Sequence, residues 1–342
     1  MPADDMTAQK LKTGPEAPDG GRTCWVITDD RVGTINQAIG LAEAVGFPFE
    51  HKIIVLRQPW RSLPPAFWPP SVFGLKGAES AKLTPPWPDL VISCGRKAIG
   101  PALAVKRASG GKTKAVHIQH PHMPLKRFDL VAVPSHDNLT GPNVIVTTGA
   151  IHRVSKAKLA AAKTGFAGQF DHLPRPLIAV LIGGSNKAFT MTRAIAESMA
   201  AQISALAGRL GAGLLVTASR RTGAENEAVL RQALSGPNVF FWDGTGENPY
   251  FGFLAQADAI LVTGDSVNMV SEAASSGKPV YIMPLETAPG AERAAGKFDR
   301  FQQQVIDKGA ARMFDDTADL DDQPVRLDET TRVAAAVKKL FQ

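Results

Sequence analysis

Four polar loops in the second half of the chain each follow a run of apolar, strand-like residues. They begin at Gly183, Ser219, Gly244 and Thr263, and their residues are mostly small, polar or basic. Parallel strands bring their carboxyl ends to one edge of a sheet, which is where open α/β sheets bind ligands. One such loop is common in any α/β protein, but four of them on one edge predict a ligand site.

The loop at Thr263 lies in the segment 260–286, ILVTGDSVNMVSEAASSGKPVYIMPLE, where a helix-like run separates two strand-like runs. Ser266 is placed to cap this helix, whose first turn then offers unpaired N–H groups and the positive end of the helix dipole to a phosphate. Glu272 lies about two turns into the helix, where its carboxylate can accept hydrogen bonds from two sugar hydroxyls. An ordinary capped helix with one exposed glutamate fits the same residues equally well.

A second candidate phosphate site is the loop IGGSNKAF, which contains Gly183, Gly184 and Ser185. It has neither the G-x-G-x-x-G spacing of dinucleotide-binding folds nor the G-x-x-x-x-G-K-[ST] spacing of P-loops. Lys187 and Arg220 would add positive charge for a diphosphate, although single loop cations that face solvent are also common.

In the first half of the chain, Asp29 and Asp30 follow the first strand-like run, and Arg96 stands at a helix start after another strand-like run. The segment HIQHPHMP places His120 near two further histidines. Because no matching set of cysteines or carboxylates accompanies them, neither a bound metal nor a bound cofactor is expected. A catalytic role and an ordinary polar loop both fit these residues.

Strand-like and helix-like segments alternate along nearly the whole chain, which is typical of parallel sheets with helices on both faces. The segment 155–175, rich in lysine, alanine and glycine, separates two such sets. We therefore predict a disordered lead over residues 1–20, an N-terminal domain over residues 21–160 and a C-terminal domain over residues 175–325. Residues 328–342 are predicted to form a helix that begins at Asp328 and packs back across the cleft onto the first domain.

The chain of 342 residues is long enough for two ordinary domains. Its content of 44% hydrophobic and 20% charged residues is typical of a globular protein. No apolar run reaches the ~18 residues that a membrane-spanning helix needs, and the first residues lack the apolar stretch of a signal peptide. Two cysteines fit a reducing compartment, so a cytoplasmic location is expected. The net charge of +6 favours anionic partners or simply serves solubility.

The segment 56–76, LRQPWRSLPPAFWPPSVFGLK, combines five prolines with four aromatic residues and three cations. So many prolines exclude a regular helix or a central strand. One interpretation is an irregular loop whose aromatic side chains cover the core. The other is a peripheral contact with an anionic membrane surface, in which Trp60, Trp68 and their neighbours lie at the level of the lipid headgroups.

The chain resembles the mitochondrial-fission Elm-type family, found in plants and widely in bacteria. The segments that carry the resemblance cover most of residues 23–285 in order: GTINQAIGLAEAVG, FDLVAVPSHD, VLIGGSNKAF, VTASRRTG, GENPYFGFLAQAD and VTGDSVNMVSEAASSGKPVY. The resemblance implies a GT-B architecture, in which two Rossmann-like, doubly wound α/β domains face each other across a cleft. The last two segments are also similar to the donor half of GT-B glycosyltransferases, including those that build lipid-linked peptidoglycan precursors.

This resemblance implies roles for residues of the C-terminal domain. Gly184 and Ser185 would face the phosphates, Ser266 would cap the helix at the diphosphate, and Glu272 would hold the ribose hydroxyls. The residues expected to bind the donor are Gly183, Gly184, Ser185, Lys187, Arg220, Asp265, Ser266, Asn268, Met269, Ser271 and Glu272.

On the acceptor side, the expected residues are Asp29, Arg96 and His120. The related glycosyltransferases often carry a histidine as base in their first glycine-rich loop, but the loop DDRVGTINQ of this chain has none. Asp30 is therefore the residue expected to deprotonate the acceptor hydroxyl.

The expected function is a metal-independent glycosyltransferase that uses a nucleotide-diphosphate sugar and a lipid-linked or cell-envelope acceptor, on the inner face of the membrane. Nucleic acid is not an expected partner. Two alternatives remain open: a non-catalytic adaptor that recruits partners to a membrane, and a nucleotide-sugar epimerase of the same fold.

Overall fold

The computed structural model describes residues 21–64, 72–315, 317–318, 320–321 and 323–342. The predicted lead over residues 1–20 lies outside the described residues. The chain divides into two compact units: unit 1 contains the residues up to Arg153 together with Asp328–Gln342, and unit 2 is Val154–Leu327. Unit 2 therefore begins before the predicted boundary at residue 160.

Unit 1 is built on a six-stranded sheet with the strand order β2-β1-β3-β4-β5-β6. Every neighbouring pair runs parallel, and the strands are short and largely apolar because helices cover both faces. The strands are β1 (Cys24–Thr28), β2 (Phe49–Ile53), β3 (Leu90–Cys94), β4 (Lys114–Ile118), β5 (Leu130–Pro134) and β6 (Val144–Thr147).

The helices of unit 1 lie on opposite faces of this sheet. One face packs against α2 and α10, and the other against α3. The α-helices are α2 (Val32–Val45), α3 (Ile99–Ala108) and α10 (Glu329–Lys339). Short 3-10 helices lie in the connections: η2 (Val72–Gly74), η3 (Gly77–Glu79), η4 (Arg96–Ala98), η5 (Leu125–Arg127) and η6 (Ser135–Asp137).

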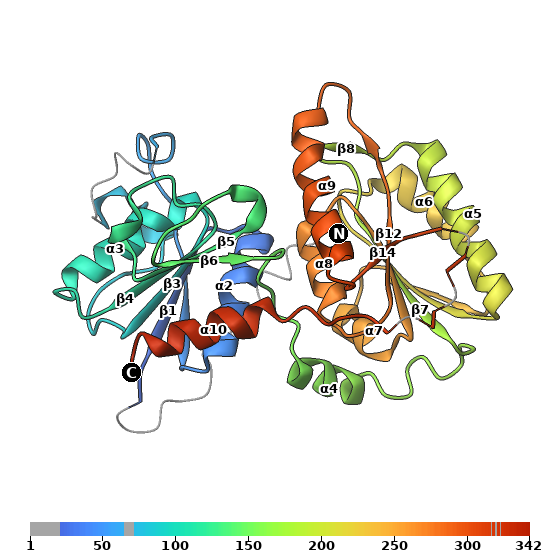
Figure 1. Cartoon of the computed structure of the whole chain (residues 1–342), viewed down its shortest axis with the longest axis horizontal. Helices are drawn as coiled ribbons and strands as arrows, with labels where there is room; N and C mark the ends of the chain where they lie inside the picture. The colour runs from blue at the N-terminus through green and yellow to red at the C-terminus, as the bar shows by residue number, and fades with distance from the viewer. Residues whose placement is uncertain (1–20, 65–71, 316, 319, 322) are drawn as a thin grey trace. The chain divides into compact units, whose positions relative to one another are not determined.

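Helix α10 returns to unit 1 and lies beside α2, as the red and blue ribbons in Figure 1 show. Val333 and Val337 are fully buried in the core that α2 forms over β1 and β3. The Glu329 carboxylate accepts a hydrogen bond from the backbone N–H of Thr148 at 3.1 Å. Asp328 occupies the N-cap position, although its side chain makes no capping hydrogen bond. The last helix is thus part of the first unit's core.

Unit 2 repeats the architecture with the strand order β10-β9-β7-β11-β12-β14, again parallel throughout. This is the doubly wound order of Rossmann folds, in which the central pair carries the change of winding direction. The strands are β7 (Leu177–Ile182), β9 (Gly213–Ala218), β10 (Val239–Phe241), β11 (Ala259–Thr263), β12 (Val280–Met283) and β14 (Arg312–Met313), and β8 (Phe189–Thr190) and β13 (Glu286–Thr287) form a separate antiparallel pair.

Helices also cover both faces of the sheet in unit 2. Its helices are α4 (Lys156–Gly165), α5 (Arg193–Leu210), α6 (Ala224–Ala233), α7 (Tyr250–Gln256), α8 (Val267–Ala274) and α9 (Glu292–Asp307). Helix α4 packs on α7: the Phe166 ring fills the space beside Gly252, and the Lys158 ammonium lies 4.9 Å from the centre of the Phe251 ring. These contacts explain why unit 2 begins before residue 160.

Among the helices within the described ranges, none is both long and apolar enough to cross a membrane.

We predict that Val337→Ala lowers the free energy of unfolding of unit 1 by about 1–3 kcal/mol, because the side chain is fully buried between α10 and α2. Urea unfolding followed by circular dichroism measures the change. Lys338→Ala is the matched control, since Lys338 is the next residue of the same helix and is exposed. Equal stability of the two variants would show that α10 contributes nothing to the core.

Candidate functional site

The loops after β7 and β11 meet at the point where the winding of unit 2 changes direction. The backbone N–H of Gly183 donates to the Thr263 hydroxyl at 2.7 Å, and that of Gly184 donates to Asp265 Oδ2 at 3.1 Å. The amide of Asn186 donates to the Asp265 carbonyl at 3.0 Å. The two loops are therefore fastened to each other at the edge where Rossmann-like folds bind their ligands.

The carboxylate of Asp265 is the centre of this network. It is 2% exposed, and it accepts hydrogen bonds from the Thr263 hydroxyl at 2.6 Å and from the guanidinium of Arg221. Arg221 belongs to the loop after β9, and its side chain remains 42% exposed. Asp265 is therefore nearly closed to solvent, and it fixes the position of an arginine that remains accessible.

Gly183 and Gly184 have a structural reason to be glycines. A side chain at Gly183 would overlap the Asp265 carboxylate, and one at Gly184 would overlap the backbone of Arg221. The amide of Ser185 donates to the Arg221 carbonyl at 3.0 Å, and its hydroxyl accepts from the amide of Met191 at 2.9 Å. The N–H groups of these three consecutive residues are thus used within the protein, so this loop differs from an open phosphate cradle.

The N-terminus of α8 carries the predicted cap. The Ser266 hydroxyl accepts from the amide of Met269 at 3.3 Å, and the first turn contains no acidic residue. Ser266, Asn268 and Met269 are half-buried. The Ser271 hydroxyl, by contrast, donates to the Val267 carbonyl at 2.7 Å and is buried inside the helix packing.

Glu272 is only 8% exposed, so the interpretation of an ordinary helix with one exposed glutamate is wrong. Its Oε2 accepts a hydrogen bond from the Tyr250 hydroxyl at 2.6 Å. Burial and the neighbouring carboxylate raise the pKa of Tyr250, so the phenol keeps its proton and remains a donor at neutral pH. Tyr250 starts α7, and sequence reasoning missed it because nothing in the sequence pairs it with Glu272.

The two predicted loop cations are exposed, and neither Lys187 nor Arg220 makes the ion pair that organises the site. The arginine that does so is the next residue along, Arg221. The sequence alone does not predict which of the two adjacent arginines makes the ion pair, because the direction of each side chain depends on the turn after β9.

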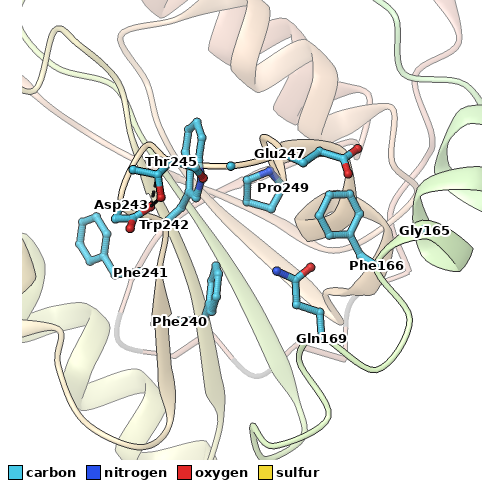
Figure 2. A pocket seen from close by; sticks show the side chains of 11 residues that line it. Gly165, Phe166, Gln169, Phe240, Phe241, Trp242, Asp243, Thr245, Glu247 and Pro249 are labelled. Atoms are coloured by element: carbon cyan, nitrogen blue, oxygen red, sulfur yellow. Dashed lines mark hydrogen bonds between the residues drawn. The ribbon is translucent and has the colours of Figure 1, made fainter. Parts of the chain in front are cut away.

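A cavity of about 470 Å³ opens beside the edge strand β10 in unit 2 (Figure 2). The rings of Phe166, Phe240 and Trp242 line it together with the polar side chains of Gln169 and Glu247. Figure 2 shows the loop after β10 folding over the cavity, with Glu247 and Phe166 on the same side of it. Sequence reasoning missed this cavity because Phe166 and Gln169 lie in the segment 155–175, which the sequence indicates only as a boundary between two domains.

The loop after β10 is held by its own hydrogen bonds. The Trp242 indole N–H donates to the Thr245 carbonyl at 2.9 Å, and the Thr245 hydroxyl donates to Asp243 Oδ1 at 2.7 Å. Pro249, the last lining residue of the cavity along the chain, directly precedes Tyr250. The cavity and Glu272 are therefore neighbours through the start of α7.

In unit 1 the predicted residues fall into separate places along the carboxyl edge. Asp29 is buried and makes ion pairs with Arg31 and Lys97, while Asp30 is exposed in the bend before α2. The Arg96 guanidinium donates to the Arg61 carbonyl at 2.8 Å, in the segment that follows β2.

The histidines form a third group, within and after β4. His117 is fully buried with Nδ1 2.9 Å from the Ser93 hydroxyl, and burial lowers the pKa of His117 to about 3. His120 stacks near His122 at 4.2 Å between ring centroids, and burial lowers its pKa as well. Within the described ranges no group of three or more histidine, cysteine or carboxylate side chains is placed to hold a metal.

The proline-rich segment 56–76 is described only in part, and Phe67 and Trp68 lie outside the described residues. Trp60 packs against the core of unit 1, as the interpretation of a covering loop requires. Phe73, however, is 77% exposed, and the Arg57 guanidinium lies 5.7 Å from the centre of its ring. The described part of the segment thus combines a covering aromatic residue with an exposed one.

Solved structures with the same fold include two UDP-GlcNAc 2-epimerases. The putative enzyme from Listeria monocytogenes has a TM-score of 0.52 at 13% identity, covering 94% of this chain and 97% of that one. The enzyme from Methanocaldococcus jannaschii has a TM-score of 0.51 at 12% identity, covering 93% and 99%. At these identities the likeness concerns the fold, and it confirms the GT-B-like class with two Rossmann-like units.

Two relatives are similar in sequence. The mitochondrial fission protein ELM1 of Arabidopsis thaliana is 31% identical over 278 residues, which are 74% of this chain and 64% of the plant protein. The uncharacterized protein RP120 of Rickettsia prowazekii (strain Madrid E) is 27% identical over 355 residues, covering 92% of this chain and 97% of that protein. The family model described as Mitochondrial fission ELM1 matches residues 32–341, and the chain therefore belongs to the mitochondrial fission ELM1 family.

Proposed function

We propose that this protein is a glycosyltransferase that binds a nucleotide-diphosphate sugar on unit 2. The observation that carries the proposal is the placement of Glu272 on α8, at the change of winding direction in unit 2. Glu272 is a buried acceptor about 9 Å along the helix axis from the cap at Ser266, at ~1.5 Å per residue. A ligand whose phosphates meet the first turn of α8 places its ribose hydroxyls beside this carboxylate.

The phosphates would be bound by α8 and by cations. The first turn of α8 carries the positive end of the helix dipole, and Arg221 is fixed on Asp265 with its side chain still partly exposed. Lys187 is exposed on the loop after β7 and adds charge. The amides of Gly183, Gly184 and Ser185 already have acceptors within the protein, so the phosphates would be bound by α8 and Arg221 instead.

The cavity beside β10 would receive the nucleobase. Its walls offer the faces of Phe166, Phe240 and Trp242 for stacking, and the Gln169 amide for hydrogen bonds. Its position next to Tyr250 agrees with a ribose held at Glu272. The UDP-GlcNAc named for the two structural neighbours makes a uridine diphosphate sugar the first ligand to test.

In the reaction, the acceptor oxygen would bond to the anomeric carbon while the bond from that carbon to the diphosphate oxygen breaks. The diphosphate leaves with the bonding electron pair, and the helix dipole and Arg221 stabilise its charge without a metal. The acceptor proton would pass to Asp30, which is exposed. Asp29 is unsuited to this role, because it is buried and its pKa is lowered by Thr34, Arg31 and Lys97 against the effect of burial.

Turnover separates this function from its alternatives. With a UDP-sugar, a transferase releases UDP only when an acceptor is present, and an epimerase changes the sugar while it stays linked to UDP. An adaptor of the mitochondrial fission type binds without either change. A lipid-linked acceptor and an anionic membrane surface are the partners we propose to supply first.

We expect Glu272→Ala to weaken the binding of a nucleoside diphosphate by about 1–3 kcal/mol, since the ribose hydroxyls lose their acceptor. Isothermal titration calorimetry with UDP, GDP, ADP and CDP measures the effect. Glu197→Ala, an exposed glutamate on α5 at the opposite face of the sheet, is the control. If none of the four nucleotides binds the unsubstituted protein, the proposed function is wrong.

A second expectation concerns the paired arginines. Arg221→Gln should weaken UDP binding by about 1.5–3 kcal/mol through the loss of charge-assisted hydrogen bonds to the diphosphate. Arg220→Gln should change it by much less, because its side chain is not held on Asp265. The same titration compares the two variants, and an equal loss in both would mean that the Asp265 network does not select the phosphate contact.

A further inference from the structure

Unit 1 has its own change of winding direction. In the order β2-β1-β3-β4-β5-β6, strand β1 lies between β2 and β3. The chain leaves β1 through α2 on one face of the sheet, whereas the helix that follows β3, α3, packs on the other face. The segments after β1 and β3 therefore diverge at the carboxyl edge, which is where ligands bind in sheets of this kind.

The carboxylate of Asp29 connects these two segments. It lies 2.8 Å from Arg31 Nε and 2.8 Å from the Thr34 hydroxyl, both after β1, and 3.4 Å from Lys97 Nζ, after β3. The side chain is 2% exposed. Burial alone would raise the pKa of Asp29, but the hydrogen bond from Thr34 and the ion pairs with Arg31 and Lys97 lower it, so the carboxylate stays charged. Asp29 thus holds two cations next to each other without reaching solvent itself.

The two cations point outward from this buried carboxylate. The side chain of Arg31 is 60% exposed and that of Lys97 is 31% exposed. Arg31 donates Nε to Asp29, so its two terminal nitrogens extend beyond the ion pair. Nη2 lies beside Gly95, 3.4 Å from the position that a Cβ atom would take there. One buried carboxylate faces two cations, so the group of Asp29, Arg31 and Lys97 carries one excess positive charge.

The start of α2 adds to this positive charge. Arg31 is the N-cap residue and makes no side-chain cap, and the first turn of α2 contains no acidic residue. The amides of Thr34 and Ile35 donate to the Arg31 carbonyl at 3.0 Å each, while those before them have no partner within the helix. The exposed carboxylate nearest in sequence is Asp30.

We propose that Arg31, Lys97 and the first turn of α2 form an anion site at the β1–β3 edge of unit 1, which binds a phosphate or diphosphate group. An arginine fork, a lysine charge and backbone amides together match the oxygens of a phosphate. The site depends on unit 1 alone. Its use in catalysis, which would make the acceptor a phosphate-bearing molecule, rests on the proposed function.

The test titrates the full chain with inorganic pyrophosphate by isothermal titration calorimetry. Arg31→Gln and Lys97→Gln should each bind about tenfold more weakly than the unsubstituted protein. Lys112→Gln should bind equally well, because Lys112 is exposed in the loop before β4 at the opposite edge of the sheet. Pyrophosphate bound by unit 2 would respond to Arg221→Gln and not to the unit 1 substitutions, so the two proposals fail separately.

Sedimentation with vesicles identifies the source of the phosphate. Binding to phosphatidylcholine vesicles that requires added phosphatidic acid, and that is lost in both unit 1 variants, assigns the site to a lipid headgroup. Pyrophosphate binding with the same dependence on Arg31 and Lys97, but without vesicle binding, assigns it to a soluble phosphate. Thermal unfolding confirms that each variant is folded. Pyrophosphate and vesicle binding that are both absent, or both unaffected by the two substitutions, would overturn the proposal.

Discussion

The carboxylate of Asp265 holds together the loops that form the carboxyl edge of unit 2. It receives the amide of Gly184, the hydroxyl of Thr263 and the guanidinium of Arg221, which come from the ends of three strands. A buried carboxylate is stable only with such partners, so the conformations of the three loops are determined together. The glycines follow from this constraint, because side chains at 183 and 184 would occupy the space of the carboxylate and of the Arg221 backbone.

Unit 1 reaches a similar arrangement with different residues. Asp29 is buried directly after β1, and it fixes Arg31 as Asp265 fixes Arg221. In both units an aspartate that is closed to solvent orients an arginine that is open to it. The shared principle is electrostatic: the buried anion sets the position of the cation, and the cation presents its remaining donors at the edge of the sheet.

The alternation of strands and helices is long and regular enough to predict parallel α/β sheets, and the resemblance to the Elm-type family implied the GT-B class. The sequence also predicted the cap at Ser266, since a capping residue acts on its own turn of helix. Contacts between segments that are distant in the sequence could not be predicted in this way. The burial of Glu272 depends on Tyr250 in another helix, and the cavity beside β10 depends on Phe166 from the segment that separates the two predicted domains.

The two units also differ in how continuous they are along the chain. Unit 2 is one continuous stretch, whereas the core of unit 1 contains Val333 and Val337 from beyond it. Domains usually complete their folding in the order in which the ribosome makes them. Here that order is reversed: unit 2 is fully synthesised before the helix that covers α2 emerges. Until then a nascent chain lacks Val333 and Val337, which complete the packing around α2, so the first unit to be translated is the last whose core is complete.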